Sequence, residues 1–469
     1  MSRLRRDSPP VSASPVGTLW DVWLGRAFGE RAMLAASERR LEGLLRFARA
    51  NSPFYRRAWS HLPEDVPKLR DVPVTAKAEL MAKFDDWATD RRVTRASVRS
   101  FIDDRSRIGQ RFLDRYIVWK SSGTTGEPGI YVQDEHALHV YDASLAAQLA
   151  TADLAARCFA GTMLQGGRAA LIAATGDHFA SIASWQRLAR SNARAYSVME
   201  PLGALVAKLN AFKPAFIASY PTLLMLLAEE RNARRLRIEP VLAWSGGEHL
   251  GERTHAELER ALGCRVMNEY GASECLSIGY GCREHWLHVN ADWAIVEPVD
   301  EDYAPTPPGE RSHTLLITNL ANRVQPIIRY DLGDSVLVHP GRCACGNPLP
   351  ALRVDGRRDD VLILTDGKRE FRVPPMALTT VFEESTGVHR FQILQRERDR
   401  LLLRVATAGD AERKRAFDVG SRALHDYLME QGARSIRIDF DDVEPQVDER
   451  SGKLRQVVVD IVTTSARDT

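Results

Sequence analysis

The sequence lacks the features that define several protein classes. It has no apolar run near the roughly 20 residues of a membrane-spanning helix, and no internal repeat or low-complexity tract. Basic and acidic residues nearly cancel, 64 against 62, so no overall positive field attracts nucleic acid or acidic lipid. Six cysteines in 469 residues are too few for a disulfide scaffold. We therefore expect a cytoplasmic protein with no membrane span and no nucleic-acid partner.

Three catalytic motifs are also missing. No HExxH occurs, so the common zinc-hydrolase arrangement is not indicated. The glycine-rich run WKSSGTTGEPGIYV, residues 119–132, is not a Walker loop because no Gly-Lys-Ser/Thr follows it. No cysteine lies in a recognisable nucleophile elbow, which argues against a cysteine-dependent enzyme.

Strand-like and helix-like segments alternate between about residues 165 and 280. Such alternation predicts βαβ units and a mainly parallel sheet, with functional residues on the loops at the strand ends. The expected strands span 169–176, 214–221, 240–248 and 264–271, and the expected helices span 201–212, 222–235 and 251–263.

The remainder of the chain suggests two further parts. Beyond residue 310 the pattern is β-rich, up to the charged turn DGRRDD at 355–360. A hairpin at 390–407, a helix at 411–430 and a strand at 435–443 follow. The predicted fold is α/β, with a flexible or peripheral N-terminus, a large body of mainly parallel sheets plus a β-rich subdomain, and a small mobile α+β lid. The corresponding ranges are 1–36, 37–356 and 357–469. The basic first 15 residues have no apolar core behind them, so we expect a flexible start and not a signal peptide.

The run at 119–132 has the composition of an anion-binding loop. Gly123 and Gly126 allow backbone N–H groups to turn toward an anion without interference from a Cβ atom. Ser122, Thr124 and Thr125 add hydroxyl donors of adjustable direction. The sequence therefore favours a polar cradle for phosphates, although an ordinary hydroxyl-rich turn has the same composition.

The order of the motifs resembles that of the adenylate-forming superfamily, which includes acyl-CoA synthetases, peptide-synthetase adenylation domains and luciferases. These motifs are SSGTTGEPG, SGGE, NEYGASE, RYDLGD, GRRDD and SGKLR. The segments ANSPFYRR and LNAFKPAFIASYPTLLMLLAEE resemble the phenylacetate–CoA ligase branch, including relatives known as capsule-biosynthesis proteins. The resemblance runs from about residue 37 to about residue 460.

The resemblance implies roles around a bound ATP. The loop Ser122–Gly126 would hold the β- and γ-phosphates, with Thr125 counted among the catalytic residues. Gly246, Gly247 and Glu248 would line the adenine, and Tyr270 would stack on it.

Further roles follow from the later motifs. Asp334 and Arg357 would reach the ribose, and Glu274 would coordinate Mg²⁺, a hard cation suited to carboxylate ligands. Asp359 would be the hinge of the lid, and Lys453 would stabilise charge developing between the acyl carboxylate and the α-phosphate.

The activity implied is ATP- and Mg²⁺-dependent activation of a small carboxylic acid to an acyl-adenylate. Transfer to a thiol, most simply that of CoA but alternatively of a carrier protein, or to an amine would follow. The branch favours an aryl acid, and Trp244 and Tyr220 would suit a flat substrate or simply belong to the core. A homodimer is left open.

Three departures from the superfamily pattern support a rival hypothesis. Gly129 stands where relatives often have lysine, threonine or serine, Glu127 adds negative charge to the loop, and Leu332 replaces a frequent threonine. The stretch after the hinge only loosely resembles the one that helps to form the thiol tunnel. The rival is a non-ligating nucleotide-binding protein of the same fold, acting as a partner in polysaccharide or natural-product biosynthesis.

Four of the cysteine and histidine residues resemble a feature of the same branch. It often has a cysteine and a histidine after the YGxSE motif and a C-x-C-G before the hinge. Cys282, His288, Cys343 and Cys345 match this arrangement and would make a closed Cys₃His set for structural Zn²⁺. His288 fits the spacing better than His285. The alternative is a set of unrelated buried thiols.

Overall fold

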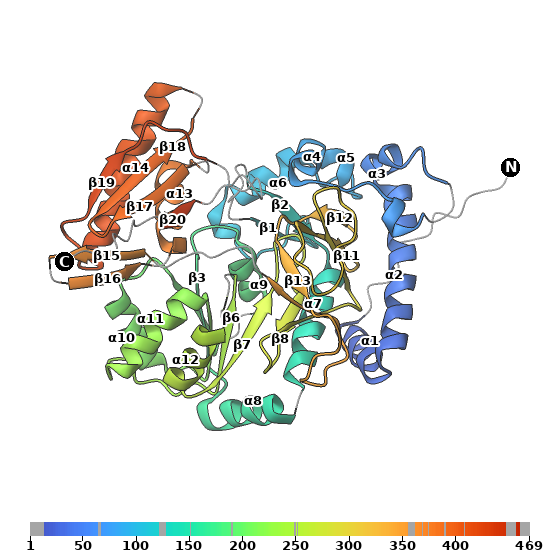
Figure 1. Ribbon diagram of the computed structural model, residues 1–469, viewed down its shortest axis with the longest axis horizontal. Helices are drawn as coiled ribbons and strands as arrows, with labels where there is room; N and C mark the ends of the chain where they lie inside the picture. Colours follow the sequence, from blue (N-terminus) through green and yellow to red (C-terminus); the bar gives the residue numbers. More distant parts are fainter. Residues whose placement is uncertain are drawn as a thin grey trace, which may run out of the picture.

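The structure is a computed structural model with a large body and a small C-terminal domain, drawn in orange and red in Figure 1. It describes residues 14–63, 67–121, 128–150, 152–188, 191–247, 250, 252–354, 362–367, 369–373, 375–388, 391–407, 409–446 and 456–459. None of the described helices combines the length and the apolar character needed to cross a lipid bilayer.

The first part of the body is mostly helical, and sequence-encoded caps fix where its helices begin. Asp134 accepts a hydrogen bond from the backbone N–H of Ala137 at 2.8 Å and so starts α7. Ser52 caps α3, whose first residue is Pro53. The elements are α1 Pro15–Ala27, α2 Glu30–Asn51, α3 Pro53–Ala58, α4 Lys77–Ala82, α5 Phe84–Trp87, α6 Arg95–Ile102, the hairpin of β1 Ile117–Lys120 and β2 Ile130–Gln133, α7 Glu135–Leu149 and α8 Ala152–Gln165.

Residues 15–27 and 30–36 are helical in the structure, whereas the sequence led us to expect a flexible or peripheral segment. Helix α1 packs along α7, and α2 runs down the side of the body in Figure 1. Val22 of α1 and Met33 of α2 are both buried. The helix α1 was not predicted because several of its large apolar side chains are exposed. Its apolar residues therefore do not gather on one face of the helix in the sequence pattern.

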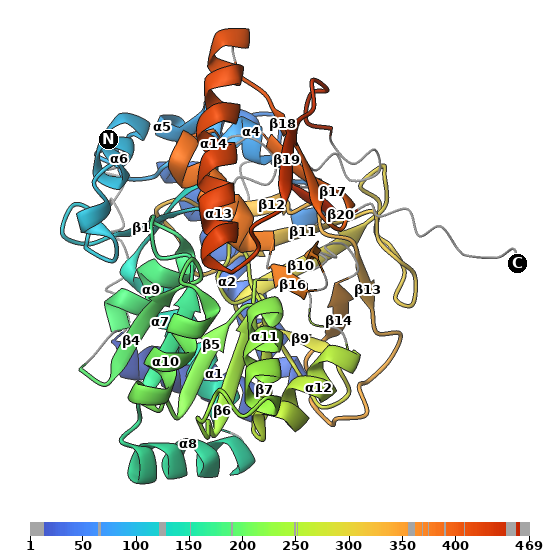
Figure 2. The same cartoon turned by 90° about the vertical axis from the view of Figure 1, so that its left-hand side faces the viewer.

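The central sheet lies between helices, as Figure 2 shows. Within the described residues its order is β13-β14-β9-β8-β7-β6-β5-β3-β4. Strands β3 to β7 are parallel to one another and connected through helices, as expected from the alternating pattern. These strands and helices are β3 Ala169–Ala173, α9 Ala180–Leu188, β4 Ala193–Ser197, α10 Leu202–Phe212, β5 Phe216–Ser219, α11 Pro221–Asn232, β6 Leu242–Gly246, α12 Glu252–Leu262 and β7 Arg265–Tyr270.

The other half of the same sheet is antiparallel and follows the parallel strands at the edge of β7. Its strands are β8 Gly279–Gly281, β9 Leu287–Val289, β13 Val336–Val338 and β14 Ala351–Val354. Short connections without a helix join β7 to β8 and β8 to β9, and these permit only antiparallel return. Strands β13 and β14 of the β-rich region therefore extend the large sheet.

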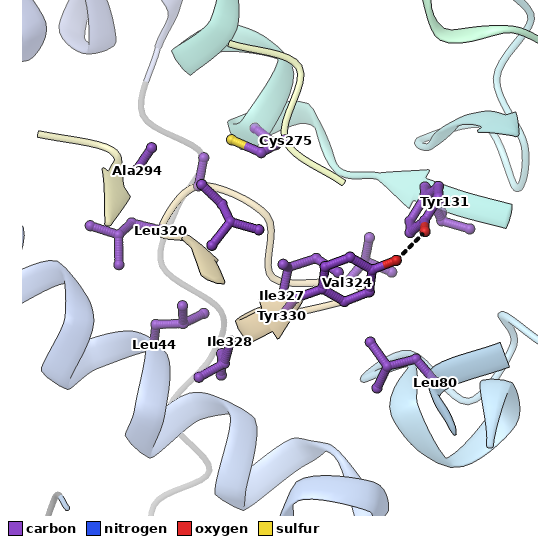
Figure 3. Close-up of a cluster of buried hydrophobic side chains, with 14 of the residues drawn as sticks. Leu44, Leu80, Tyr131, Cys275, Ala294, Leu320, Val324, Ile327, Ile328 and Tyr330 are labelled. Atoms are coloured by element: carbon purple, nitrogen blue, oxygen red, sulfur yellow. Dashed lines mark hydrogen bonds between the residues drawn. The ribbon is translucent and has the colours of Figure 1, made fainter. Parts of the chain in front are cut away.

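A second β layer completes the body. Strands β10 Ala294–Val299, β11 Thr314–Asn319 and β12 Ile327–Asp331 form an antiparallel sheet. Figure 3 shows how Ile328 of β12 and Leu44 of α2 meet in the core, while Tyr131 of β2 and Tyr330 of β12 approach through their hydroxyl groups. This core fixes the position of β12 and of the segment that follows it.

The C-terminal domain combines a hairpin, two helices and a four-stranded sheet of order β19-β18-β17-β20. Its apolar residues and those around α10 and α11 form one buried cluster, so the two domains share a packed seam. The backbone N–H of Leu202 donates to Gln431 Oε1 at 3.3 Å across that seam. The elements are β15 Leu362–Asp366, β16 Arg369–Val373, α13 Pro375–Thr386, β17 Phe391–Glu397, β18 Arg400–Val405, α14 Asp410–Glu430, β19 Arg437–Phe440 and β20 Val457–Val459.

Candidate active site

A cavity of about 1190 Å³ runs along β3, β5, β6 and β7 and reaches the loops that follow them. Lys120 and Ser121 at the end of β1, and the segment from Tyr330 to Asp334, form further parts of its wall. Its volume exceeds the roughly 300–1,000 Å³ of a typical small-molecule site. The cavity therefore has room for a nucleotide and a second molecule together.

Two tyrosines hold the carboxylate predicted to bind Mg²⁺. Glu274 lines the cavity and is largely buried. Its Oε1 accepts hydrogen bonds from the hydroxyl groups of Tyr131 at 2.6 Å and Tyr330 at 2.7 Å. Burial and the nearby Glu274 charge raise the pKa of both tyrosines, so both remain donors. Neither tyrosine was identified from the sequence, because the hydrogen bonds join residues far apart in the chain.

The same tyrosine explains the glycine that departs from the superfamily pattern. A Cβ atom built on Gly129 would lie 2.5 Å from the hydroxyl oxygen of Tyr131 and 2.7 Å from its ring. The Tyr131 side chain thus occupies the space that a larger residue at position 129 would need. The position of Tyr131 therefore accounts for glycine at residue 129.

Two residues predicted to contact the nucleotide are hydrogen-bonded to each other. The Tyr270 hydroxyl donates to Asp334 Oδ2 at 2.8 Å. Tyr270 ends β7 and Asp334 lies in the loop after β12, so this bond ties the central sheet to the second β layer. Asp334 lines the cavity, and Tyr270 lies behind it within hydrogen-bond distance.

The glycines predicted to line the adenine end β6. Gly246 pairs across the sheet with Glu269. Gly247 has a φ of +82°, a conformation that favours glycine, and a Cβ atom there would lie 3.2 Å from the Tyr220 ring. Both glycines line the cavity. The backbone can therefore approach a flat ligand closely at this point.

Lys120 places a positive charge next to the predicted phosphate loop. It is the last residue of β1, forms an ion pair with Asp177 and lines the cavity. Its backbone N–H donates to the carbonyl oxygen of His178 at 2.8 Å. Nothing in the sequence distinguishes this lysine from the other basic residues, 64 in all.

Several predicted residues lie outside the described part of the chain. These are Ser122, Gly123, Thr124, Thr125 and Gly126 of the loop, together with Glu248, Arg357, Asp359 and Lys453. Their roles stay predictions. Four described members of the set line one cavity: Gly246, Gly247, Glu274 and Asp334. Tyr270 is hydrogen-bonded to one of these lining residues, Asp334.

The predicted zinc ligands converge in space. The ligand atoms of Cys282, His288, Cys343 and Cys345 all lie within 4.8 Å of one another. Cys282 Sγ is 3.7 Å from Cys343 Sγ, and Cys345 Sγ is 3.2 Å from His288 Nε2. His285 instead packs edge-on against His255, with ring centroids 5.0 Å apart.

This geometry fits a tetrahedral ion. With Zn–S bonds of about 2.3 Å, ligand atoms in a tetrahedron lie about 3.8 Å apart, close to the distance between Cys282 and Cys343. His288 Nδ1 is 2.9 Å from the carbonyl oxygen of Leu349, a hydrogen bond that leaves Nε2 directed at the sulfurs. Gly346, with φ +87°, turns the chain after Cys345. The residues present therefore fit Zn²⁺.

Comparisons with known proteins give both sequence relatives and structural neighbours. No family model matches the chain. Phenylacetate-coenzyme A ligase of Thermus thermophilus is 26% identical over 353 residues, which cover 70% of this chain and 71% of that protein. Protein CapK of Staphylococcus aureus is 24% identical over 226 residues, 46% of each chain. A crystal structure of 2-hydroxyisobutyryl-CoA ligase in complex with 2-HIB-AMP and CoA has a TM-score of 0.55 at 22% identity, covering 97% of this chain and 94% of that one.

The chain therefore has the fold of a CoA ligase of known structure, and its sequence is similar to that of a phenylacetate-coenzyme A ligase. The two sequence relatives come from the branch that the motifs resembled, phenylacetate–CoA ligases and capsule-biosynthesis proteins.

Proposed function

We propose that this protein uses ATP and Mg²⁺ to activate a carboxylic acid, with an aryl acid favoured, as an acyl-adenylate and then passes the acyl group to the thiol of CoA. The observation that carries the proposal is the gathering of Glu274, Asp334 and the Gly246–Gly247 turn on one cavity large enough for nucleotide and acid. The names of the relatives support the same chemistry.

Each described residue has a task in this reaction. Glu274, held by two tyrosine hydroxyls, offers its remaining lone pairs to Mg²⁺, which would offset charge on the phosphates. Asp334 accepts hydrogen bonds, as ribose hydroxyls require, and Tyr270 fixes its orientation. The Gly246–Gly247 turn lets the base lie against the backbone. Lys453 of the lid would offset charge developing during adenylation.

Carboxylate-dependent exchange of labelled pyrophosphate into ATP tests the proposal. We expect at least one acid from a panel of aryl, fatty and amino acids to support exchange. Lys453→Ala should abolish the exchange and leave ATP binding nearly intact, whereas Lys414→Ala, at an exposed lid position, should change neither. ATP binding without exchange for any acid would favour the non-ligating protein, and equal exchange in the Lys453 variant would remove that residue from the mechanism.

We also propose that Cys282, His288, Cys343 and Cys345 hold a structural Zn²⁺ that stabilises the antiparallel half of the central sheet. Four protein ligands leave no open position for water, so the ion would take no part in the chemistry. Reduced thiols are required for this role, which supports action in a reducing cytoplasm. A homodimer stays a prediction.

Metal analysis tests the zinc site. The purified protein should contain about one equivalent of Zn²⁺, and the cobalt-substituted protein should show thiolate absorption. Cys343→Ser should lower the metal content and the thermal stability, whereas Cys158→Ser, a cysteine of α8 outside the cluster, should not lower the metal content. Less than half an equivalent of zinc without thiolate absorption would argue against the site.

A further inference from the structure

The wall of the cavity formed by the parallel strands is a nearly apolar surface. Leu171, Ala218, Trp244 and Met267 are cross-strand neighbours in β3, β5, β6 and β7, so their side chains share one face of the sheet. The first three line the cavity. The alternate residues Ile217, Ala243 and Val266 point to the opposite face, where they join the large core of the C-terminal side.

Glu269 brings a carboxylate to this apolar face. It lies two residues after Met267 in β7 and therefore points to the same side of the sheet, and it lines the cavity. Its Oε2 accepts a hydrogen bond from the indole N–H of Trp244 at 2.8 Å. The Ser277 hydroxyl is a second donor to it. The side chain is thus held in place by two neutral groups.

No cation among the described residues compensates the charge of Glu269. Asp142, another acidic residue of the cavity wall, is by contrast paired with Arg187 at 2.6 Å. Burial raises the pKa of Glu269 to about 7, although the hydrogen bonds from Trp244 and Ser277 lower it. A carboxyl group in such surroundings is unfavourable unless a further hydrogen bond or a positive charge reaches it.

We propose that Glu269 is a specificity-determining residue that accepts a hydrogen bond from an amino or hydroxyl group on the acid substrate. The substrate class is then a flat, mostly apolar carboxylic acid with a donor group besides its reacting carboxylate. The apolar side chains of the cavity wall, together with Trp185, which packs with Leu171 and Ala218, would contact the apolar part of such an acid. This inference rests on the proposed function, because it assumes that the acid occupies the same cavity as the nucleotide.

The strongest competing role for Glu269 is structural. Its bond to Trp244 joins β6 to β7, so a substitution could disturb the sheet without any contact to substrate. The two roles differ in what they affect. A structural defect lowers the activity with every acid, whereas loss of a substrate contact changes the ratio between acids that differ only in the donor group.

Matched benzoates make this distinction. We would measure kcat/KM for pyrophosphate exchange with 3- and 4-substituted benzoates bearing an amino, hydroxyl or methyl group, using wild type, Glu269→Gln and Glu269→Leu. Wild type should prefer an amino or hydroxyl acid over its methyl counterpart by about 10- to 100-fold, as expected for a hydrogen bond to a charged group. Glu269→Leu should remove that preference and retain activity with the methyl acid. Glu38→Gln, at an exposed position of α2, is the control.

The pH dependence gives a second readout. With wild type, kcat/KM for the donor-bearing acid relative to the methyl acid should rise as the pH passes about 7, because Glu269 then ionises and becomes a better acceptor. The ratio should be independent of pH in Glu269→Gln. An unchanged donor preference in Glu269→Leu, or equal losses for all acids in folded variants, would overturn the proposal.

Failure of the Glu269 contact can be distinguished from failure of the proposed ligase activity. If no acid supports exchange, the function fails, and titration calorimetry of the same benzoates still tests Glu269 through binding alone. Tighter binding of the amino or hydroxyl acid to wild type, lost in Glu269→Leu, would support the contact. Equal binding of all three acids to wild type would overturn it.

Discussion

At the scale of single residues, the hydroxyl of Tyr131 joins three functional parts of the protein. It follows the predicted phosphate loop in β2, and it bonds to Glu274 and to Tyr330 of β12. The position of Glu274 therefore depends on the strand that leaves the loop.

We predict that Tyr131→Phe weakens the binding of Mg²⁺ and lowers the stability of the fold only moderately. Removing one donor from a buried carboxylate should reduce the unfolding free energy by about 1–3 kcal/mol and raise the Mg²⁺ concentration needed for half-maximal exchange. Denaturant unfolding and a Mg²⁺ titration of pyrophosphate exchange measure the two effects. Tyr427→Phe, in the lid, should leave the Mg²⁺ titration unchanged. A wild-type titration in Tyr131→Phe would show that its hydroxyl does not position Glu274.

Glu269 should make stability depend on pH in a defined direction. Because burial raises its pKa from 4.5 to about 7, the folded protein binds this proton more tightly than the unfolded chain does. The resulting stabilisation is fully present below about pH 4.5 and is lost as the pH rises through about 7. Glu269→Gln should therefore gain stability relative to wild type between pH 5 and pH 8, by at most about 3 kcal/mol. Urea unfolding at several pH values measures the difference, and a difference independent of pH would contradict the prediction.

At the scale of helices and strands, the sequence predicted those elements whose residue pattern is recognisable within a single segment. The strands β3, β5, β6 and β7 were expected because each is a short apolar run bounded by turn residues or a helix. The zinc set was predicted because the cysteines and His288 match the arrangement that the resembling branch often has, including a C-x-C-G pair. The direction of β8 and β9 was missed, since strand pairing depends on connections and not on composition.

The candidate site shows the same division. Glu274 and Asp334 were predicted because their motifs are local and ordered along the chain. Tyr131, Lys120 and Glu269 were missed because their significance arises only from contacts between distant segments. Glu269 stands inside NEYGASE, yet the motif gives no indication that its side chain faces an apolar cavity.

The packing of α13 against α14 gives a prediction for the lid. A Cβ atom on Gly420 would lie 2.1 Å from the Phe382 ring. Gly420→Ala should therefore destabilise the lid by about 1–3 kcal/mol through overpacking, against the stabilisation that alanine normally gives a helix. At Gly203 of α10 a Cβ atom meets nothing within 4 Å, so Gly203→Ala should be neutral or stabilising. Thermal unfolding of both variants measures the contrast. Equal unfolding temperatures would show that α13 can move aside at no cost in stability.

At the scale of the whole molecule, the lid contacts the body beside the cavity. Glu384 of α13 lies against Gly176, close to the ion pair of Lys120 and Asp177. Burial raises the pKa of Glu384, while Arg105 and Lys120 lower it. This position of the lid therefore brings a carboxyl group of one domain next to basic groups of the other.

Replacing Gly176 by a residue with a side chain should destabilise this position of the lid and no other position of it. If the lid rotates between the two half-reactions, Gly176→Leu should change adenylation and thiol transfer unequally, because the clash with Glu384 exists only when α13 is in place. Pyrophosphate exchange and thioester formation measured separately should differ in their response by several-fold. Gly203→Leu should leave their ratio unchanged. A proportional loss of both activities in Gly176→Leu would point to general destabilisation instead.

The hydrogen bond between Trp244 and Glu269 gives the protein its own optical probe. The indole ring of Trp244 faces the cavity, and its N–H group touches the carboxyl group that we expect to titrate near neutral pH. Ionisation of that carboxyl group, or arrival of an acid in the cavity, alters the electric field at the ring. The emission spectrum of wild type compared with a Trp244→Phe variant would isolate this fluorophore from the other tryptophans. Occupancy of the cavity can then be followed without label, ATP or turnover.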